Sequence, residues 1–271
     1  MTGNPNYVYD PTELKSLIGR EQGRPALLIG GGLSARASGH LHLSLSIRHK
    51  LWPVIIALNG CNTDPTLAPL IDYDVRLECD PGPDGTLPDW QWTPLPNATV
   101  LMNWRLSSPV WAGGKLLDAY RQFAADPGNY RELVLAERSN GDYGPAEEHI
   151  REIRHGLWYG KWDGVPGKPP RGTSLNQMLH LAGALGCTSA HSIGFELCIK
   201  DETRHHWYAE ELYNEQASRK PHWPVVEYCG LKTFDWWIES AKWLLDLRDL
   251  WRQQGFEWTD YSDGLLQRME K

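Results

Sequence analysis

Short apolar runs that end in glycine or asparagine recur along the chain, and they constrain its fold more than any other feature. Three of them are Pro25–Ile29 before Gly30-Gly31-Gly32, Pro53–Leu58 before Asn59, and Thr99–Asn103. Each run is as long as a typical strand and mostly apolar, which is the pattern of strands buried on both faces of a sheet. Because segments with helical patterns separate the runs, the sequence predicts an α/β fold with a mostly parallel sheet and helices on both faces.

The remaining segments fit the same plan. Further strands are expected at Asp74–Leu77, at Glu132–Ala136, just before Gly194 and at Phe256–Trp258. Helices are expected from Ser34 to about His49, at Lys115–Ala125, at Pro145–Arg154, from the Gly172–Ser174 turn to Gly186, at Thr203–Gln216 and at Thr233–Gln254. Residues 80–97 and 160–172 are rich in proline and glycine, which indicates surface loops. We therefore expect one domain over residues 1–271, with a C-terminal helical extension and a candidate lid segment at residues 197–230.

The composition is that of a folded protein without a secretory or membrane signature. Hydrophobic residues make up 41% of the 271 residues, enough for the core of one large α/β domain. The formal net charge of −7 argues against a protein that coats nucleic acid nonspecifically. The five cysteines form no CxxC pair, so we expect neither a disulfide framework nor a cysteine zinc site, and a cytoplasmic location fits best. No apolar run approaches the roughly 18 residues that span a bilayer, and we see no signal peptide.

Small and amide residues stand where the predicted strands end. Besides the three glycines and Asn59, Asn103 ends a strand and Glu196 follows another. Open parallel sheets bind ligands outside the carboxyl ends of their strands, where glycines admit a phosphate and asparagines bond a base or ribose. The Gly172-Thr173-Ser174 turn opens a helix, and the free amides of such a turn suit phosphate. The sequence therefore predicts a nucleotide site, although three glycines alone also fit an ordinary tight turn.

Three ordered motifs resemble those of a known superfamily. They are LLIGGGLSA (27–35), VIIALN (54–59) and GTSLNQMLHLAGALGCTSAHSIGFE (172–196). The superfamily contains bacterial CMP-sialyltransferases and archaeal 6-hydroxymethylpterin diphosphokinase-like proteins, and the phage-encoded members look especially similar in length and layout. The family's first motif usually reads G-N-G-P-S, whereas this chain has Gly30-Gly31-Gly32-Leu33-Ser34, and the family's G-x-D ends here in Glu196.

The resemblance implies a Rossmann-like domain that transfers a group from a bound nucleotide, as a glycosyltransferase does. In the sialyltransferase branch the donor is a nucleotide sugar, no metal is essential, and a histidine after the G-x-D strand is the base. His205 or His206 would be that base, and Glu196 would orient the donor or acceptor. Arg204 and Tyr208 would steady the leaving phosphate. The expected donor-binding residues are Gly30, Gly31, Gly32, Ser34, Asn59, Asn103, Arg171, Gly172, Thr173, Ser174, Arg204 and Tyr208.

Alternatives for the chemistry stay open. In the diphosphokinase branch, Mg²⁺ held by carboxylates such as Glu196, Asp201 and Glu202 would assist pyrophosphate transfer from ATP to a hydroxymethyl group. Asp72-Tyr73-Asp74 is a weaker metal candidate, because two aspartates at i and i+2 share one face of an extended segment. The histidine pair also fits exposed positions on a helix, and His222 is a lesser candidate. A nucleotide-binding protein without catalysis fits the altered first motif as well.

The acceptor is open too. Lys161, Lys168 and Arg171 stand near Trp158 and Trp162, and such a mixture of cations and aromatics contacts phosphates and stacks on bases. DNA is therefore a candidate acceptor, although an ordinary flexible loop has the same composition. The motifs of serine hydrolases, zincins and P-loop enzymes are missing from the sequence, and the three glycines do not complete the GxGxxG of dinucleotide dehydrogenases.

Overall fold

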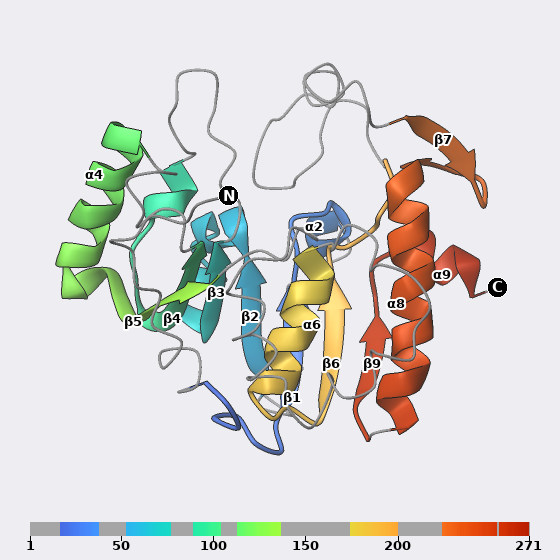
Figure 1. Cartoon of the computed structure of the whole chain (residues 1–271), viewed down its shortest axis with the longest axis horizontal. Coiled ribbons are helices and arrows are strands. Elements are labelled where there is room, and N and C mark those ends of the chain that lie inside the picture. Colours follow the sequence, from blue (N-terminus) through green and yellow to red (C-terminus); the bar gives the residue numbers. More distant parts are fainter. Residues whose placement is uncertain are drawn as a thin grey trace, which may run out of the picture.

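Seven parallel strands form one sheet at the centre of the protein (Figure 1). The computed structural model describes residues 17–37, 53–76, 89–103, 113–136, 174–199, 224–253 and 255–270. The strands are β1 (Pro25–Ile29), β2 (Val54–Leu58), β3 (Tyr73–Arg76), β4 (Leu95–Asn103), β5 (Tyr130–Ala136), β6 (Ser189–Ile193) and β9 (Glu257–Asp260). They lie in the order β5-β4-β3-β2-β1-β6-β9, and every neighbouring pair is parallel. The prediction of an α/β fold with a parallel sheet is confirmed.

The strand order reverses between β1 and β6. From β1 the chain adds β2, β3, β4 and β5 on one side, and it then returns to place β6 and β9 on the other side. The loops that follow β1 and β6 therefore leave neighbouring strands at the same edge and continue in different directions. Open parallel sheets bind ligands at this kind of position, so the topology points to the carboxyl ends of β1 and β6.

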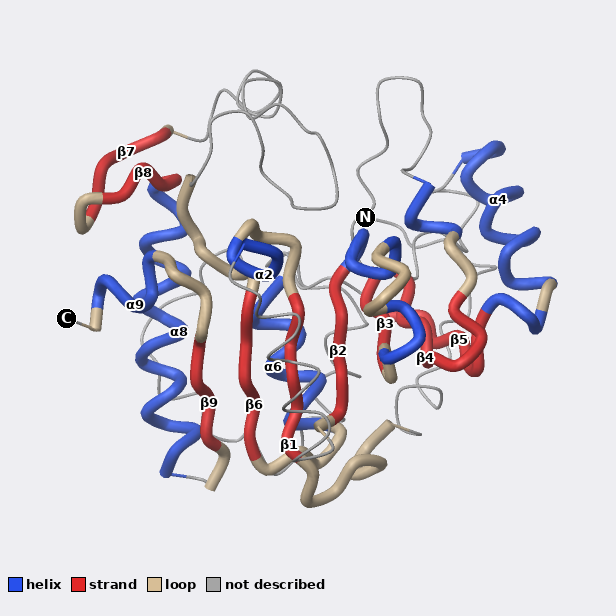
Figure 2. The backbone as a smooth tube through the Cα atoms, turned by 180° about the vertical axis from the view of Figure 1, so that it is seen from behind, coloured by secondary structure: helices blue, strands red, loops and turns tan. Residues whose placement is uncertain are grey.

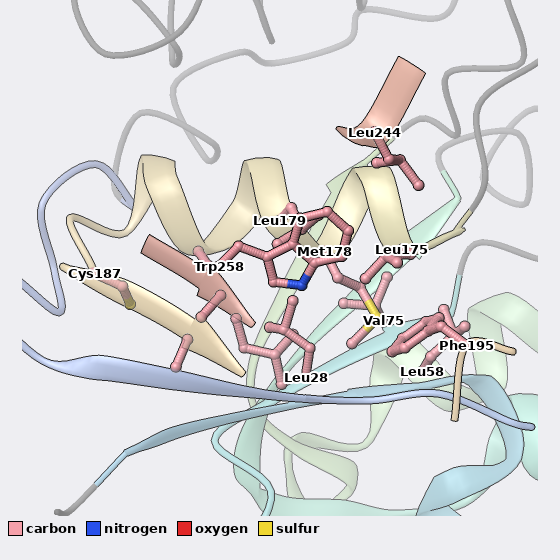
Figure 3. Packing of buried hydrophobic residues seen from close by; sticks show 14 of the residues in the cluster. Leu28, Leu58, Val75, Leu175, Met178, Leu179, Cys187, Phe195, Leu244 and Trp258 are labelled. Carbon is pink, nitrogen blue, oxygen red and sulfur yellow. The ribbon is translucent and has the colours of Figure 1, made fainter. Parts of the chain in front are cut away.

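Both faces of the sheet are covered by apolar clusters, which explains why the central strands β1 and β2 are continuous apolar runs. Leu28 and Ile56 belong to one buried cluster, and their chain neighbours Leu27 and Ile55 belong to the other. Helices α6 (Ser174–Ala184) and α8 (Asp235–Gln253) contribute to the first cluster, which Figure 3 shows packed beneath α6. Helices α2 (Ser34–Ala37) and α4 (Gly113–Ala125) contribute to the second. Because adjacent strand residues point to opposite faces, each face needs its own cover.

The remaining described elements are short. Short 3-10 helices are η1 (Asn59–Thr63), η2 (Ala68–Leu70), η3 (Asp89–Trp92) and η5 (Pro127–Asn129). Strands β7 (Val225–Tyr228) and β8 (Leu231–Phe234) form a separate antiparallel hairpin, and α9 (Leu265–Met269) follows β9 (Figure 2). Within the described part of the chain, no helix combines the length and the apolarity that a membrane crossing requires.

Three local predictions were wrong. The segment 80–97 is not all loop, because residues 89–92 form η3 with Gln91 buried, and β4 begins at Leu95 rather than Thr99. The pairing of β4 with β5 shifts between Leu95 and Thr99, and this irregular proline-containing start hides the strand from pattern reading. The hairpin was missed, and Thr233 lies in β8 rather than in the long helix, because each hairpin strand is only four residues long.

Other predictions fall on residues that the structure does not describe. The helices expected at 145–154 and 203–216 lie there, as do residues 38–49 of the first helix and most of the candidate lid at 197–230. These predictions, and the extent of the domain over the whole chain, stay predictions.

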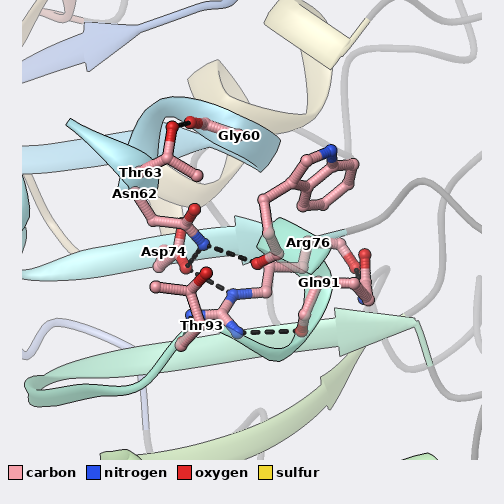
Figure 4. A network of polar contacts seen from close by, with 8 residues as sticks. Gly60, Asn62, Thr63, Asp74, Arg76, Gln91 and Thr93 are labelled. Carbon is pink, nitrogen blue, oxygen red and sulfur yellow. Dashed lines mark hydrogen bonds and ion pairs between the residues drawn. The ribbon is translucent and has the colours of Figure 1, made fainter. Parts of the chain in front are cut away.

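A fully buried ion pair ties the 3-10 helices to the sheet. Asp74 and Arg76 stand two residues apart on β3, so they share a face, and neither side chain is exposed. Arg76 Nε donates to Asp74, while its other nitrogens donate to the carbonyl oxygens of Gln91 at 2.9 Å and Thr93 at 2.7 Å (Figure 4). Asn62 Nδ2 donates to Asp74 Oδ2 at 3.0 Å. The network therefore holds η1 and η3 on the carboxyl half of β3.

Breaking this pair should destabilise the fold far more than breaking an exposed one. Asp74→Ala leaves the Arg76 charge buried without compensation, so we expect it to lower the free energy of unfolding by about 3–5 kcal/mol. The double variant Asp74→Ala/Arg76→Met should recover part of this loss, because no unpaired charge remains. Urea denaturation measures all three free energies.

The exposed pair of Lys242 and Glu239 on α8 supplies the control. Glu239→Ala should leave the free energy of unfolding nearly unchanged, since solvent already screens that pair. If Asp74→Ala proved as mild as Glu239→Ala, the role given to the buried network would be incorrect.

Candidate functional site

The carboxyl edge of the sheet gathers several of the residues that the sequence singled out. Gly30–Ser34 follow β1, Asn59 follows β2, and Gly194 and Glu196 follow β6, and these three strands are neighbours. Asn103 ends β4 at the same edge, but three strands from β1, which is roughly 14 Å at the usual strand spacing. The described residues therefore bring together the β1, β2 and β6 ends, and Asn103 stands apart from them.

The first turn of α6 points to the same edge. The helix ends beside the opposite, amino edge, where Gly23 N donates to Gly186 O at 3.0 Å and Thr188 N donates to Arg24 O at 3.0 Å. Its first turn is consequently at the carboxyl side, and Leu175 packs there near Leu58 and Phe195 (Figure 3). Ser174, the first residue of α6, is half-buried.

The loops after β1 and β6 pack backbone against backbone. Gly30 N donates to Ile193 O and Gly32 N donates to Gly194 O, each at 2.8 Å. A Cβ atom on Gly30 would lie 2.4 Å from Gly194 O, and one on Gly194, whose φ is +81°, would lie 2.5 Å from Gly30 O. Only glycine fits at such distances. Gly30 and Gly32 of the first motif thus have a structural use, which is the close approach of the two loops.

The Glu196 carboxylate occupies the turn after β1. Glu196 is 6% exposed, and its Oε1 accepts a hydrogen bond from the Ser34 backbone N–H at 2.5 Å. A Cβ atom on Gly32 would lie 1.6 Å from Glu196 Oε2, so the carboxylate lies directly over that glycine. Ser34 Oγ accepts from Gly194 N at 3.3 Å. Ser34 was expected to bind the donor, but its backbone amide is bonded to a carboxylate of the chain itself.

The segment after β9 fixes the backbone around Glu196. Leu265 N donates to Glu196 O at 2.7 Å, and Phe195 N donates to Ser262 Oγ at 2.8 Å. Leu197 adopts a φ of +49°, which an L-residue with a branched side chain rarely adopts. Such strain persists only where the surroundings enforce it, so the position of Glu196 is strongly determined.

A second carboxylate, Asp260 at the end of β9, is close enough to Glu196 for the two charges to interact, and it was not among the predicted site residues. Asp260 Oδ1 accepts from Ser192 Oγ at 2.7 Å and from Ser262 Oγ at 2.9 Å, while Oδ2 is buried without a hydrogen-bond partner among the described residues. Burial raises the pKa of Asp260 to about 7, the hydrogen bonds from both serines oppose the rise, and the Glu196 charge adds to it. The available sequence signal was an aspartate at the end of a strand, as with Asn59 and Asn103.

Asn59 combines two unfavourable features in one residue. Its φ is +50°, and its side chain is 7% exposed with Oδ1 buried and without a partner among the described residues. Asparagine tolerates a left-handed backbone better than most residues, but a buried oxygen without a hydrogen bond costs about 1–3 kcal/mol. Native proteins usually satisfy such atoms, so this one requires an explanation.

The two aspartates of the DxD sequence have other structural partners. Asp74 belongs to the buried pair with Arg76, and Asp72 Oδ2 accepts from Ile55 N at 2.9 Å just before β3 begins. Asp72 therefore lies toward the amino end of the strand. No group of three or more histidine, cysteine, aspartate or glutamate residues suited to a metal ion occurs among the residues that the structure describes.

Several predicted site residues lie outside the described ranges. They are Arg171, Gly172, Thr173, Asp201, Glu202, Arg204, His205, His206, Tyr208 and His222. Their roles stay predictions.

Comparison of the chain with protein-family models, with curated proteins and with solved structures gave no match. The resemblance inferred from the three motifs therefore remains a prediction.

Gly32 gives a direct test of the contact with Glu196. Gly32→Ala should lower the free energy of unfolding by about 1–3 kcal/mol, because the new methyl group overlaps the carboxylate and must displace it. Gly32→Ala/Glu196→Ala should recover part of the loss, since Gly194 O still lies 2.7 Å from the new Cβ. Urea denaturation of the unaltered protein, the two single variants and the double variant gives the coupling energy between Gly32→Ala and Glu196→Ala.

Gly114 in α4 is the matched control, because a Cβ atom there meets nothing within 4 Å. Gly114→Ala should stabilise the protein by about 0.5–1 kcal/mol through its helix propensity. Strictly additive effects of Gly32→Ala and Glu196→Ala would contradict the contact.

Asp260 should make the stability depend on pH. A carboxyl group with a higher pKa in the folded chain than in the unfolded chain stabilises the fold while it is protonated. This contribution is complete below about pH 4, the ordinary pKa of aspartate, and it is lost as the pH rises through about 7. Denaturation between about pH 5 and pH 8 should therefore show Asp260→Asn becoming steadily more stable relative to the unaltered protein. A constant difference across this range would contradict the raised pKa.

Proposed function

We propose that this chain is a nucleotide-dependent group transferase built on a Rossmann-like domain, and that it takes a glycosyl group from a nucleotide-sugar donor. The donor would bind at the carboxyl ends of β1, β2 and β6, where the strand order reverses. The observation that carries the proposal is the amide oxygen of Asn59, which lies beside that reversal, buried and without a hydrogen-bond partner among the described residues.

Asn59 supports a ligand site because no contact among the described residues offsets its two unfavourable features. The left-handed backbone and the buried oxygen both oppose folding, and a hydroxyl or amino group of a ribose or base would satisfy the oxygen on binding. Strained residues of this kind cluster at ligand sites, where the strained group is already positioned to bind the ligand. Asn59 is thus assigned to the nucleoside part of the donor.

The position of Glu196 gives different roles to the turn after β1 and the turn that opens α6. A phosphate beside the Glu196 carboxylate would be repelled, and the Ser34 amide is already bonded to that carboxylate. The donor phosphates are therefore assigned to the first turn of α6, with Ser174 and the preceding residues Arg171, Gly172 and Thr173. An 11-residue helix has free amides and a positive dipole end there. Glu196 itself would accept a hydroxyl of the sugar or ribose.

The proposed chemistry follows from the sequence analysis. The acceptor hydroxyl attacks the anomeric carbon of the donor sugar, the bond from that carbon to the phosphate oxygen breaks, and the nucleotide leaves with the electron pair. His205 or His206 would take the proton of the hydroxyl, and Arg204 and Tyr208 would stabilise the charge on the leaving phosphate. A hydroxyl linked to DNA stays a candidate acceptor.

Binding without turnover is the second candidate function. The observation that favours it is the Glu196 carboxylate over Gly32, which fills a turn that nucleotide enzymes commonly keep open for phosphate.

A ligand panel tests the proposal. CMP, UDP, ATP, CMP-linked sugars and UDP-linked sugars are each added with and without Mg²⁺, and the melting temperature of the protein is measured. At a hundredfold excess over its dissociation constant, a true ligand stabilises the fold by about 2.7 kcal/mol. Asn59→Ala should weaken the best ligand about five- to tenfold by calorimetry, in keeping with the loss of one hydrogen bond.

Asn97 is the matched control, because it is exposed and lies in the first half of β4, toward the opposite edge. Asn97→Ala should leave the affinity unchanged. The proposal fails if no nucleotide or nucleotide sugar stabilises the protein, or if the two asparagine variants bind equally well. Product formation with an acceptor distinguishes a transferase from a binding protein.

A further inference from the structure

We propose that Asp260 is a positioning residue for Glu196, holding the loop after β6 so that the Glu196 carboxylate lies over the turn after β1. The inference rests on the proposed function in one respect, which is that Glu196 belongs to the ligand site. The connection itself is built from hydrogen bonds between β6, β9 and the segment after β9.

The hydroxyl groups of two serines connect Asp260 to its surroundings. Ser192 Oγ donates to Asp260 Oδ1 and accepts from Trp258 Nε1 at 2.8 Å. Ser262 Oγ donates to the same Oδ1 and accepts from Phe195 N at 2.8 Å. A serine hydroxyl has one hydrogen, so giving it to Asp260 leaves the oxygen oriented to accept from the indole or the amide. The Asp260 oxygen therefore fixes the direction of both hydroxyls.

Phe195 precedes Glu196, so the hydrogen bond at its amide acts directly on the Glu196 backbone. The same segment holds Glu196 from the other side, because Leu265 N donates to Glu196 O and a Cβ atom on Gly264 would lie 2.2 Å from Glu196 O. The Glu196 side chain then reaches Ser34 N, 162 positions earlier in the chain. A continuous path thus runs from Asp260 through Ser262 and Phe195 to the turn after β1.

The second oxygen of Asp260 takes no part in the hydrogen bonds with the two serines. Oδ2 is buried without a hydrogen-bond partner in the described residues, and Glu196 is the charged group that raises the pKa of Asp260 in addition to burial. Gln267, from α9, donates to the Asp260 backbone oxygen at 3.1 Å and not to its carboxylate among the contacts described. Two carboxylates so arranged repel one another when both are ionised, and the loop position of Glu196 responds when Asp260 gains or loses its proton.

Nuclear magnetic resonance of the full chain without ligand tests the path. The reporters are the backbone amides of Ser34 and Phe195 and the indole N–H of Trp258, followed between about pH 5 and pH 9. The chemical shifts of all three groups should change with pH, with a shared midpoint near pH 7. Asp260→Asn keeps an oxygen acceptor for the serines but cannot titrate, so the shared transition should disappear while the signals stay near their low-pH positions. Asp260→Ala should displace all three signals at every pH.

Asp249→Asn on α8 is the control, because this aspartate is exposed and, among the contacts described, pairs only with Arg252 three residues further along the same helix. It should leave the three transitions unchanged. If Ser34 neither titrates with Phe195 nor responds to Asp260→Asn or Asp260→Ala, then Asp260 merely supports its own turn and the inference is overturned.

Ligand affinity separates this inference from the proposed function. With the best nucleotide of the panel, the dissociation constant of the unaltered protein should change severalfold across the midpoint, whereas that of Asp260→Asn should not change with pH. A shared transition at Ser34 without any nucleotide binding would retain the positioning path and refute the proposed function. Nucleotide binding without the shared transition would retain the proposed function and refute the positioning path.

Discussion

The close approach of the loops after β1 and β6 is the constraint on which the rest of the structure depends. These two strands are neighbours where the strand order reverses, so their loops must separate within a few residues. Gly30, Gly32 and Gly194 allow the two backbones to meet, with amide-to-carbonyl distances of 2.8 Å. This contact leaves room above Gly32 for one carboxylate, and the carboxylate that fills it comes from Glu196. The arrangement of polar groups at the carboxyl edge of the sheet thus depends on the packing of these glycines as much as on the polar side chains themselves.

The buried carboxylates of this protein fall into two groups with different consequences. Asp74 is compensated by Arg76, whose guanidinium also bonds two backbone carbonyls, so this pair serves the cohesion of the fold. Glu196 and Asp260 have no such cation among the contacts described, and they are held by amide and hydroxyl hydrogens instead. Burial and the nearby Glu196 charge raise the pKa of Asp260 to about 7, so this residue retains the capacity to gain or lose a proton near neutral pH.

The sequence predicted the sheet well because its signals are local. Pro25–Ile29, the strand of the first motif, was assigned with its observed bounds, β2 and β3 were placed to within a residue, and β6 lies just before Gly194 as expected. Periodicity could not find the hairpin of β7 and β8, whose strands are too short to show it, nor the irregular start of β4 at Leu95. The candidate site was predicted in part. Asn59 and Glu196 were named from their place after a strand, but a linear motif does not reveal that Glu196 folds back onto Gly32, or that Asp260 lies close to it. Both facts depend on partners more than sixty positions away.

The central claim is that a nucleotide binds at the carboxyl ends of β1, β2 and β6. A crystal structure of the chain with the nucleotide that stabilises it most tests this claim most directly. The account predicts the nucleoside within hydrogen-bond distance of Asn59 Oδ1, the phosphates at the first turn of α6, and Glu196 still bonded to Ser34 N. A nucleotide bound at the amino edge of the sheet, or one whose phosphate displaces Glu196 from the turn after β1, would contradict it.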